Sequence, residues 1–302
     1  RIDYSNDTPT AVAKGPLSKA RYVFTATGNL SYGYWGGGYP GPYSTVDRVD
    51  YSNDTATAAA KGPLTVARYG MGATGNADYG YWGGGNPGPY STVDRIDFSN
   101  DSPTALVKGP LSAAKYYVTA TGNASYGYFG GGSPGTVSTV NRIDYSNDTP
   151  TTPTKGPLSV ARRSLTATGN SNYGYFGGGY PGPNSTVDRL DYSSDTTTAA
   201  AKGPLTSARY ALGATGSSSH GYFAGGNTGS IVSTVDRVDY SSDTPTATAK
   251  GPLTSTKRGM GAASPRANAL PTQNIYSTTV SSSDEVSGTR HTVGTDYGYW
   301  GA

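Results

Sequence analysis

The stretch "YGYWGGG", from Tyr32 to Gly38, places aromatic residues beside a run of glycines, and close copies of it recur along the chain. The copies begin at Tyr79, Tyr126, Tyr173 and His220, and a shorter one begins at Tyr297. Two further motifs recur with the same period of about 47 residues, an Arg-[Ile/Val/Leu]-Asp triplet and "KGPL". Motifs that repeat in register indicate a tandem array of one structural unit.

One unit, from Arg68 to Lys115, contains four short runs separated by residues that favour turns. The runs are predicted as strands at 67–73, 78–83, 91–98 and 102–108. After the first run, Thr-Gly-Asn is suited to positive φ in a tight hairpin turn. The third run, "STVDRIDF", alternates side chains between two faces with the period of a strand. No run has helical periodicity.

Four strands in each unit of this length are typical of a blade in a β-propeller. The sequence therefore predicts an all-β protein, a β-propeller of four-stranded blades, as a single domain over residues 1–302. The chain starts with the third and fourth strands of a unit and ends with a first and a second strand. Joined in one blade, they would close the ring with strands from both termini and leave no open sheet edge.

The unit resembles the kelch repeat. That pattern has a basic residue at its start, an aromatic strand ending in Gly-Gly, a "vevYDp" third strand and a Pro-containing link to the next basic residue. The matching features are Arg68, "YWGG" from Tyr81 to Gly84, "VDRIDFSND" from Val93 to Asp101, and "KGPLSAAK" from Lys108 to Lys115. The resemblance covers roughly the first 260 residues. It implies a kelch-like propeller fold.

The number of blades follows from the basic residues that open the units. These are Arg21, Arg68, Lys115, Arg162, Arg209, Lys257 and Arg290. They predict seven blades, with a degenerate blade between residues 257 and 290, where the repeated motifs are lost. The alternative is a ring of six blades with an insertion in this segment.

The charge and hydropathy of the sequence argue against two kinds of partner, nucleic acids and membranes. The formal net charge is only +3, and basic residues alternate with acidic ones, so nucleic-acid binding is not expected. No apolar run is long enough to cross a bilayer, so no membrane insertion is expected. The chain starts at Arg1 with neither Met nor a signal-like segment, and we expect a processed or partial chain.

Few residues suit catalysis, so the sequence predicts a protein that is not an enzyme and needs no cofactor. It contains one glutamate (Glu285), two histidines (His220 and His291) and no cysteine. Both histidines replace repeated residues, which favours structural roles. The alternative is a glycan-processing propeller enzyme with its site in the channel. It would need acidic residues that converge on one blade, and the blade that departs from the repeat is the one with Glu285, Arg290 and His291.

Acidic and basic residues that recur in every unit raise two further hypotheses. Asp97, Asn100 and Asp101 offer oxygen ligands, yet a turn needs these residue types for its backbone, and we predict no metal site. The basic residues could surround a channel mouth and attract an anion, or each could pair with an aspartate such as Asp47 or Asp94. The predicted anion ring comprises Arg21, Arg68, Lys115, Arg162, Arg209 and Arg290.

The loops after the glycine run are the best candidates for binding, because they differ between units whose flanking motifs do not. They read "YPGPY", "NPGPY", "SPGTV", "YPGPN" and "NTGSIV". Tyrosines in rigid loops make strong contacts at low entropic cost. The predicted binding residues are Tyr39, Pro40, Tyr43, Tyr90 and Tyr180. These loops could instead serve only to shield the blade edges.

The "STVDRIDYSNDT…KGPL…AR…ATGN…YGYFGGG" unit is also similar to repeat proteins of marine bacteriophage particles. That resemblance implies a virion or extracellular location and a structural or adhesive role. The expected function is recognition of a cell-surface glycan or of other structural proteins of the same assembly. A further alternative is an intracellular kelch-type adaptor.

Overall fold

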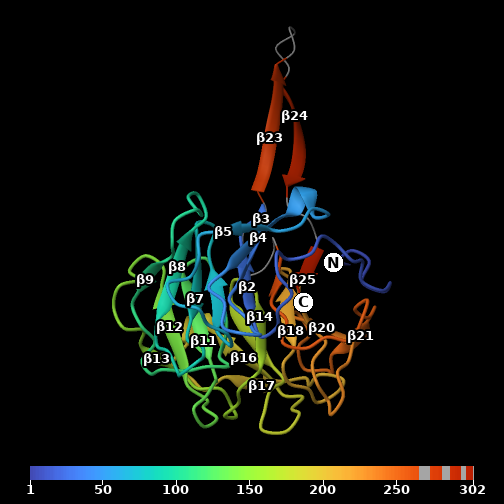
Figure 1. Ribbon diagram of the computed structural model, residues 1–302. Helices are drawn as coiled ribbons and strands as arrows, with labels where there is room; N and C mark the ends of the chain where they lie inside the picture. Colours follow the sequence, from blue (N-terminus) through green and yellow to red (C-terminus); the bar gives the residue numbers. More distant parts are fainter. Residues whose placement is uncertain (265–272, 281–285, 294–296, 302) are drawn as a thin grey trace.

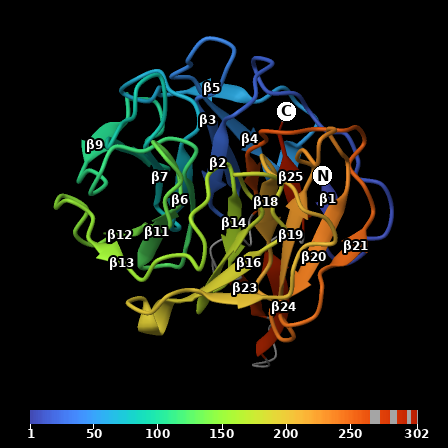
Figure 2. The ribbon, with the colours of Figure 1, turned by 90° about the horizontal axis from the view of Figure 1, so that it is seen from below.

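The computed structural model describes residues 1–264, 273–280, 286–293 and 297–301, and of 273–280 and 286–293 only the backbone. In this part of the chain, six sheets surround a central axis (Figures 1 and 2). No helix among the residues described has the length and apolar character needed to cross a membrane. The prediction of an all-β propeller with four-stranded blades is confirmed.

Five blades are complete and repeat the same strand order. The innermost strands are β2 (Thr25–Gly28), β6 (Gly72–Gly75), β10 (Thr119–Gly122), β14 (Thr166–Gly169) and β18 (Gly213–Gly216). The second strands are β3 (Tyr32–Gly36), β7 (Tyr79–Gly83), β11 (Tyr126–Gly130), β15 (Tyr173–Gly177) and β19 (His220–Ala224). The third strands are β4 (Val46–Asp50), β8 (Val93–Asp97), β12 (Val140–Asp144), β16 (Val187–Asp191) and β20 (Val235–Asp239). The outer strands are β5 (Ala59–Lys61), β9 (Leu106–Lys108), β13 (Thr154–Lys155), β17 (Ala200–Lys202) and β21 (Thr248–Lys250).

The sixth blade joins both ends of the chain. Its strands are β22 (Ala262–Ala263), β25 (Tyr297–Trp300) and β1 (Ile2–Asp3), and β1 pairs with β25 in antiparallel register. The first blade is held to it by Asp54, which pairs with Arg1 at 2.6 Å and accepts a hydrogen bond from the Tyr299 hydroxyl at 3.0 Å. The ring is thus closed by strands from the two termini.

The prediction of seven blades was wrong, and the alternative of six blades with an insertion is the arrangement that the structure shows. Lys257 opens the sixth blade, and a hairpin of β23 (Gln273–Val280) and β24 (Val286–Val293) lies between the first two strands of that blade. The hairpin stands out from the ring in Figure 1. Arg290 lies in β24, so it opens no blade, and its match to the basic position of the repeat is coincidental.

The first strand of each blade begins later than the sequence predicted. In the second blade it is β6, because Gly70 has a φ of +67° and ends the extended run that starts at Arg68. The following turn depends on Asn76, whose side-chain oxygen accepts hydrogen bonds from the backbone N–H groups of Asp78 and Tyr79 at 2.9 Å. An Asx-type turn therefore replaces the predicted positive-φ hairpin turn.

In the first four blades, the glycine that ends the second strand permits close packing against the next blade. Trp82 of the second blade is fully buried, and its indole lies against Gly36 of the first, where an added Cβ would overlap it. Phe129 of the third blade lies against Gly83 of the second in the same way. Aromatic and glycine positions are thus adjacent in the sequence because they contact each other across successive blades.

A buried aspartate in the turn after each third strand links neighbouring blades. Asp101 of the second blade accepts hydrogen bonds from Tyr34 at 2.9 Å and Arg48 at 2.8 Å, and pairs with Lys61 at 3.1 Å, all in the first blade. Burial opposes ionisation of Asp101, but these donors and charges outweigh it and lower its pKa. The equivalent residues are Asp7, Asp54, Asp148, Asp195 and Asp243.

Candidate functional site

The Gly-Pro loops are fixed to the scaffold at both of their ends. Tyr39 exchanges two backbone hydrogen bonds of 2.8 Å with Tyr22 of the same blade. Four residues later, the carbonyl of Tyr43 accepts from the N–H of Arg68 in the next blade at 3.0 Å. Each loop therefore spans two blades, and its side chains are presented on a rigid backbone.

Five tyrosines from three successive blades form a connected group, here called the tyrosine cluster. Its members are Tyr22, Tyr39, Tyr69, Tyr116 and Tyr117. The ring of Tyr39 lies 5.3 Å from that of Tyr22 and 5.4 Å from that of Tyr69, both edge to face. The ring of Tyr69 lies in turn 6.5 Å from the ring of Tyr117, between centroids. Tyr22 and Tyr39 are 42% and 38% exposed, so the cluster presents aromatic surface to solvent.

The other loop tyrosines of the prediction lie apart from this cluster. Tyr180 has the same loop position as Tyr39 and a similar exposure (37%). In the described part of the chain, however, its ring contacts one tyrosine, Tyr210 at 5.8 Å, and the guanidinium of Arg163 at 4.7 Å. Tyr43 is partly buried with the ammonium of Lys19 above its ring at 5.3 Å. Tyr90 is also partly buried, near Arg68. Pro40 is exposed beside Tyr39.

Sequence reasoning missed Tyr22, Tyr69, Tyr116 and Tyr117. The signal was present, since an aromatic residue follows the opening basic residue in "RY" at 21 and 68 and in "KYY" at 115. Because neighbouring side chains of an extended segment point to opposite sides, a buried basic residue directs the following tyrosine outward.

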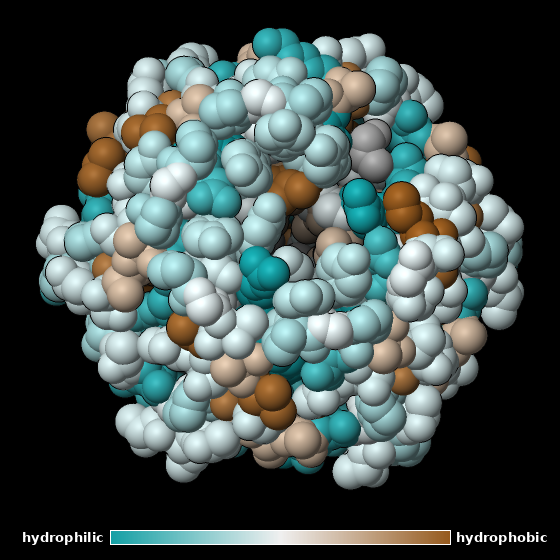
Figure 3. Space-filling view, turned by 60° about the horizontal axis from the view of Figure 1, so that its bottom comes forward, coloured by the Kyte–Doolittle hydropathy of each residue, from teal (hydrophilic) through white to brown (hydrophobic). Residues whose placement is uncertain are grey.

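A closed ring of backbone hydrogen bonds surrounds the axis near the cluster. The residue two positions after each opening basic residue has positive φ and donates its N–H to the equivalent carbonyl of the preceding blade, at 2.6–3.1 Å. The six residues are Val23, Gly70, Tyr117, Ser164, Ala211 and Gly259. They line a cavity of about 100 Å³ on the axis. Figure 3 shows a face that is hollowed at its centre, with hydrophobic side chains near the rim.

Tyr117 belongs both to this ring and to the tyrosine cluster. Its φ of +53° is unfavourable for a residue with a bulky side chain, and two other blades have glycine here. Such strain persists only where the surrounding structure imposes it, and it gathers at functional sites. Tyr117 both lines the axial cavity and contacts Tyr69 and Tyr116, so it joins the cavity to the tyrosine cluster.

The basic residues predicted as an anion ring are directed into the blades instead. Arg68 is fully buried and pairs with Asp94 at 2.7 Å, and its guanidinium also donates to the carbonyls of Gly84 and Thr92. Burial lowers the pKa of Arg68, and the charge of Asp94 opposes that shift. The same buried pairs occur at Arg21, Arg162 and Arg209. Since these charges are inaccessible, we propose no anion site there; the side chain of Arg290 lies outside the described residues.

In the third blade this pair lacks the negative charge. Lys115 replaces arginine and donates at 2.8 Å to Asn141, which replaces aspartate. Both residues are buried, and burial lowers the pKa of Lys115 from its ordinary 10.5 to about 8. The folded state therefore loses this proton at a lower pH than the unfolded state does, so this group makes the protein more stable as pH rises from about 8 to about 10.

We expect Asn141→Asp to remove that dependence, because a carboxylate beside Lys115 would hold its proton. Between pH 7.5 and 9.5, the free energy of unfolding of the natural protein should rise relative to the variant by about 2 kcal/mol. Denaturant unfolding at several pH values measures the difference, in which other titrating groups cancel. Parallel pH profiles for the two proteins would contradict the assignment to Lys115.

Groups suited to metal binding or acid–base chemistry do not converge in the described structure. Among its residues, no group of three or more His, Cys, Asp or Glu could hold a metal ion. Asp97 accepts hydrogen bonds from the backbone and hydroxyl of Ser99, as turn chemistry predicts, whereas Asp101 is buried between blades. His220 lies 3.9 Å from Asp239 at the blade surface. The side chains of Glu285, Arg290 and His291 fall outside the described residues.

The comparisons with known proteins define the fold class and no narrower group. No protein-family model matches the chain, and no curated protein sequence matches it. The solved structure of a protein called YjhT is similar, with a TM-score of 0.68 and 12% sequence identity, over 83% of this chain and 89% of that one. At such low identity this similarity shows a shared β-propeller fold alone.

Proposed function

We propose that the protein is a non-enzymatic recognition module that binds a surface glycan through the tyrosine cluster. The observation that carries the proposal is the contact between aromatic rings of three blades, which share one partly exposed surface. Tyrosine rings combine a broad apolar face with a hydroxyl that can donate or accept a hydrogen bond. This combination suits sugars, which have both apolar ring faces and hydroxyl groups.

The rigidity of the scaffold supports this function. The loop that carries Tyr39 is held by backbone hydrogen bonds to two blades, so little conformational entropy is lost when a ligand binds. The kelch-like and bacteriophage-repeat identities remain predictions, as do the virion or extracellular location and a role among other proteins of one assembly.

Tyr39→Ser and Tyr180→Ser form a matched pair for testing the site. Both residues have the same loop position and nearly equal exposure, but only Tyr39 belongs to the cluster. After a screen of immobilised bacterial and algal glycans, titration calorimetry would compare the two variants with the natural protein. We expect Tyr39→Ser to weaken binding at least about tenfold and Tyr180→Ser to leave it nearly unchanged.

Three other outcomes have clear meanings. Equal losses in both variants would place binding across all the loops rather than at the cluster. Equal retention would exclude the cluster as the site. The absence of glycan binding by the natural protein would contradict the glycan proposal and favour recognition of a partner protein.

A further inference from the structure

The outer edge of the second blade differs in composition from the other outer edges. Its outer strand, β9, lies at the rim of the ring (Figures 1 and 2) and consists of Leu106, Val107 and Lys108. Leu106 and Val107 are 59% and 62% exposed, more than any other large apolar residue in the part of the chain that the structure describes. The residues at the same two positions of the other units are Val12–Ala13, Ala59–Ala60, Pro153–Thr154, Ala200–Ala201 and Thr248–Ala249.

The other blades show that the fold does not need these side chains. Alanine or threonine at the same positions supports the same pairing of third and outer strands, for example in β17 and β21. Large aliphatic residues at both positions occur in β9 alone. Covering them would favour association with another molecule, because burial of apolar surface is the main favourable term in most protein association.

The main chain of β9 is also open on its outer side. In the third blade the N–H of Arg142 donates to the carbonyl of Pro153 at 3.0 Å, and Arg95 and Leu106 are the equivalent pair in the second blade. Bonded and non-bonded pairs alternate along antiparallel strands, so the next residue, Val107, directs its N–H and carbonyl away from β8. An apolar edge with open main-chain groups is a template for pairing with another strand.

This edge is complementary to a second copy of itself. In an antiparallel pair of two β9 strands with the two-fold axis at Val107, each Val107 N–H would donate to the carbonyl of the other. The register then places Leu106 of each copy opposite Lys108 of the other, whose aliphatic stem would cover it. A two-fold contact uses the same patch on both copies, which is what one apolar edge in each molecule provides.

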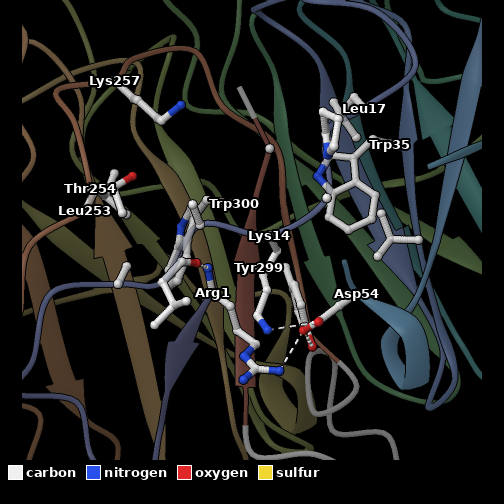
Figure 4. A pocket seen from close by; sticks show the side chains of 17 residues that line it. Arg1, Lys14, Leu17, Trp35, Asp54, Leu253, Thr254, Lys257, Tyr299 and Trp300 are labelled. Carbon is white, nitrogen blue, oxygen red and sulfur yellow. Dashed lines mark hydrogen bonds and ion pairs between the residues drawn. The ribbon is translucent and has the colours of Figure 1, made fainter. Parts of the chain in front are cut away.

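The charges at this edge do not oppose the approach of a second copy. Lys108 and Arg95 both pair with Asp148, at 3.1 and 2.7 Å. Figure 4 shows the same arrangement at Asp54, between the sixth and first blades. Asp97 follows Arg95 on the same face of β8, so the four charges of this edge cancel. Two copies therefore meet without repulsion between like net charges.

We propose that the protein forms a two-fold symmetric dimer in which β9 of one copy pairs antiparallel with β9 of a second copy. The two second blades then form one continuous sheet, and the side chains of Leu106 and Val107 become buried between the copies. The contact is small compared with that of a permanent dimer, so we expect a Kd on the order of 100 µM. This inference does not depend on the proposed glycan function.

Sedimentation velocity of the 302-residue protein, from about 10 µM to about 1 mM, measures the association. We expect mostly monomer at the lowest concentration and mostly dimer at the highest. The double variant Leu106→Ala/Val107→Ala gives β9 the Ala-Ala-Lys sequence of β5 and β17, so it should fold normally and associate at least about tenfold more weakly. Val107→Pro removes the outward N–H without a bond to β8 and should weaken association to a similar extent.

Val160→Ser is the matched control, because Val160 is an exposed apolar residue (46%) outside the outer strands. It should associate like the natural protein. The thermal unfolding midpoint of each variant checks that the fold is retained. A protein that stays monomeric at about 1 mM, undiminished association of Leu106→Ala/Val107→Ala or of Val107→Pro, or an equal loss in Val160→Ser would overturn the proposal.

Cross-linking tests the register directly, since the chain contains no cysteine. Bonded partners in an antiparallel pair have Cα atoms about 5.5 Å apart, a separation that suits a disulfide. The Val107→Cys variant, oxidised by air at high concentration, should therefore form a covalent dimer on a non-reducing gel. Val160→Cys under the same conditions should remain mostly monomeric. Equal cross-linking of the two variants, or none in Val107→Cys, would contradict the β9 pairing.

Discussion

Asp94→Ala is expected to lower the free energy of unfolding by about 3–5 kcal/mol. The Asp94 carboxylate is fully buried and pairs with Arg68, whose guanidinium is equally inaccessible. It also accepts hydrogen bonds from the backbone N–H and the hydroxyl of Thr65, at 3.0 and 2.6 Å. Truncation therefore leaves a buried positive charge without its counter-charge and two donors without an acceptor.

Equilibrium unfolding in denaturant measures the change, with two controls that the repeat provides. Asn141→Ala alters the same position of the next blade, where the partner is Lys115, and should cost only about 1–2 kcal/mol, because a neutral acceptor is lost. Asp97→Ala removes a carboxylate of a surface turn and should cost about 1 kcal/mol or less. Equal losses for Asp94→Ala and Asn141→Ala would show that the buried charge contributes no special stability.

The repeat made the architecture predictable because its motifs have structural roles in every blade. The aromatic–glycine stretch forms a second strand. Its glycine, such as Gly36, leaves room for the indole of Trp82 from the following blade to pack against the backbone. The Arg-x-Asp triplet holds Arg48, which reaches Asp101 of the neighbouring blade. These contacts recur from blade to blade, so the spacing of the motifs in the sequence matches the spacing of the blades.

The number of blades and the proposed binding surface were harder to predict from the sequence, for physical reasons. Arg290 matched the basic position of the repeat by residue type alone. In the blades, the basic residue at the start of the first strand pairs with groups of its own sheet, as Arg68 pairs with Asp94. The spacing of residues in the sequence does not show whether such partners are present. The tyrosine cluster depends on ring contacts between Tyr39 of one blade and Tyr69 of the next. Such contacts follow from the angle between blades, which the period of the repeat does not reveal.

Gly109→Ala is the second change for which we expect a large loss of stability, at least about 3 kcal/mol. Gly109 is the glycine of a "KGPL" motif, and its N–H donates to the carbonyl of Asp148 in the next blade at 2.7 Å. A Cβ added at Gly109 would overlap the carbonyl oxygen of Pro150, which is main chain and cannot rotate away. Relief of the overlap requires the two blades to separate, which also weakens the contacts of the buried Asp148 with Tyr81 and Arg95.

Gly88→Ala is the matched control, because it separates the effect of steric overlap from that of backbone conformation. Gly88 lies in a Gly-Pro loop with a φ of +74° and has open space where its Cβ would be placed, so alanine should cost only about 1–2 kcal/mol. Thermal and denaturant unfolding of both variants give the comparison. If Gly109→Ala proved no more costly than Gly88→Ala, the blades would be able to separate readily at this crossing. The "KGPL" glycine would then recur in all six units for a reason other than contact between main chains. If instead Gly109→Ala lowers the free energy of unfolding several times more than Gly88→Ala does, the glycine is needed for the close approach of neighbouring blades.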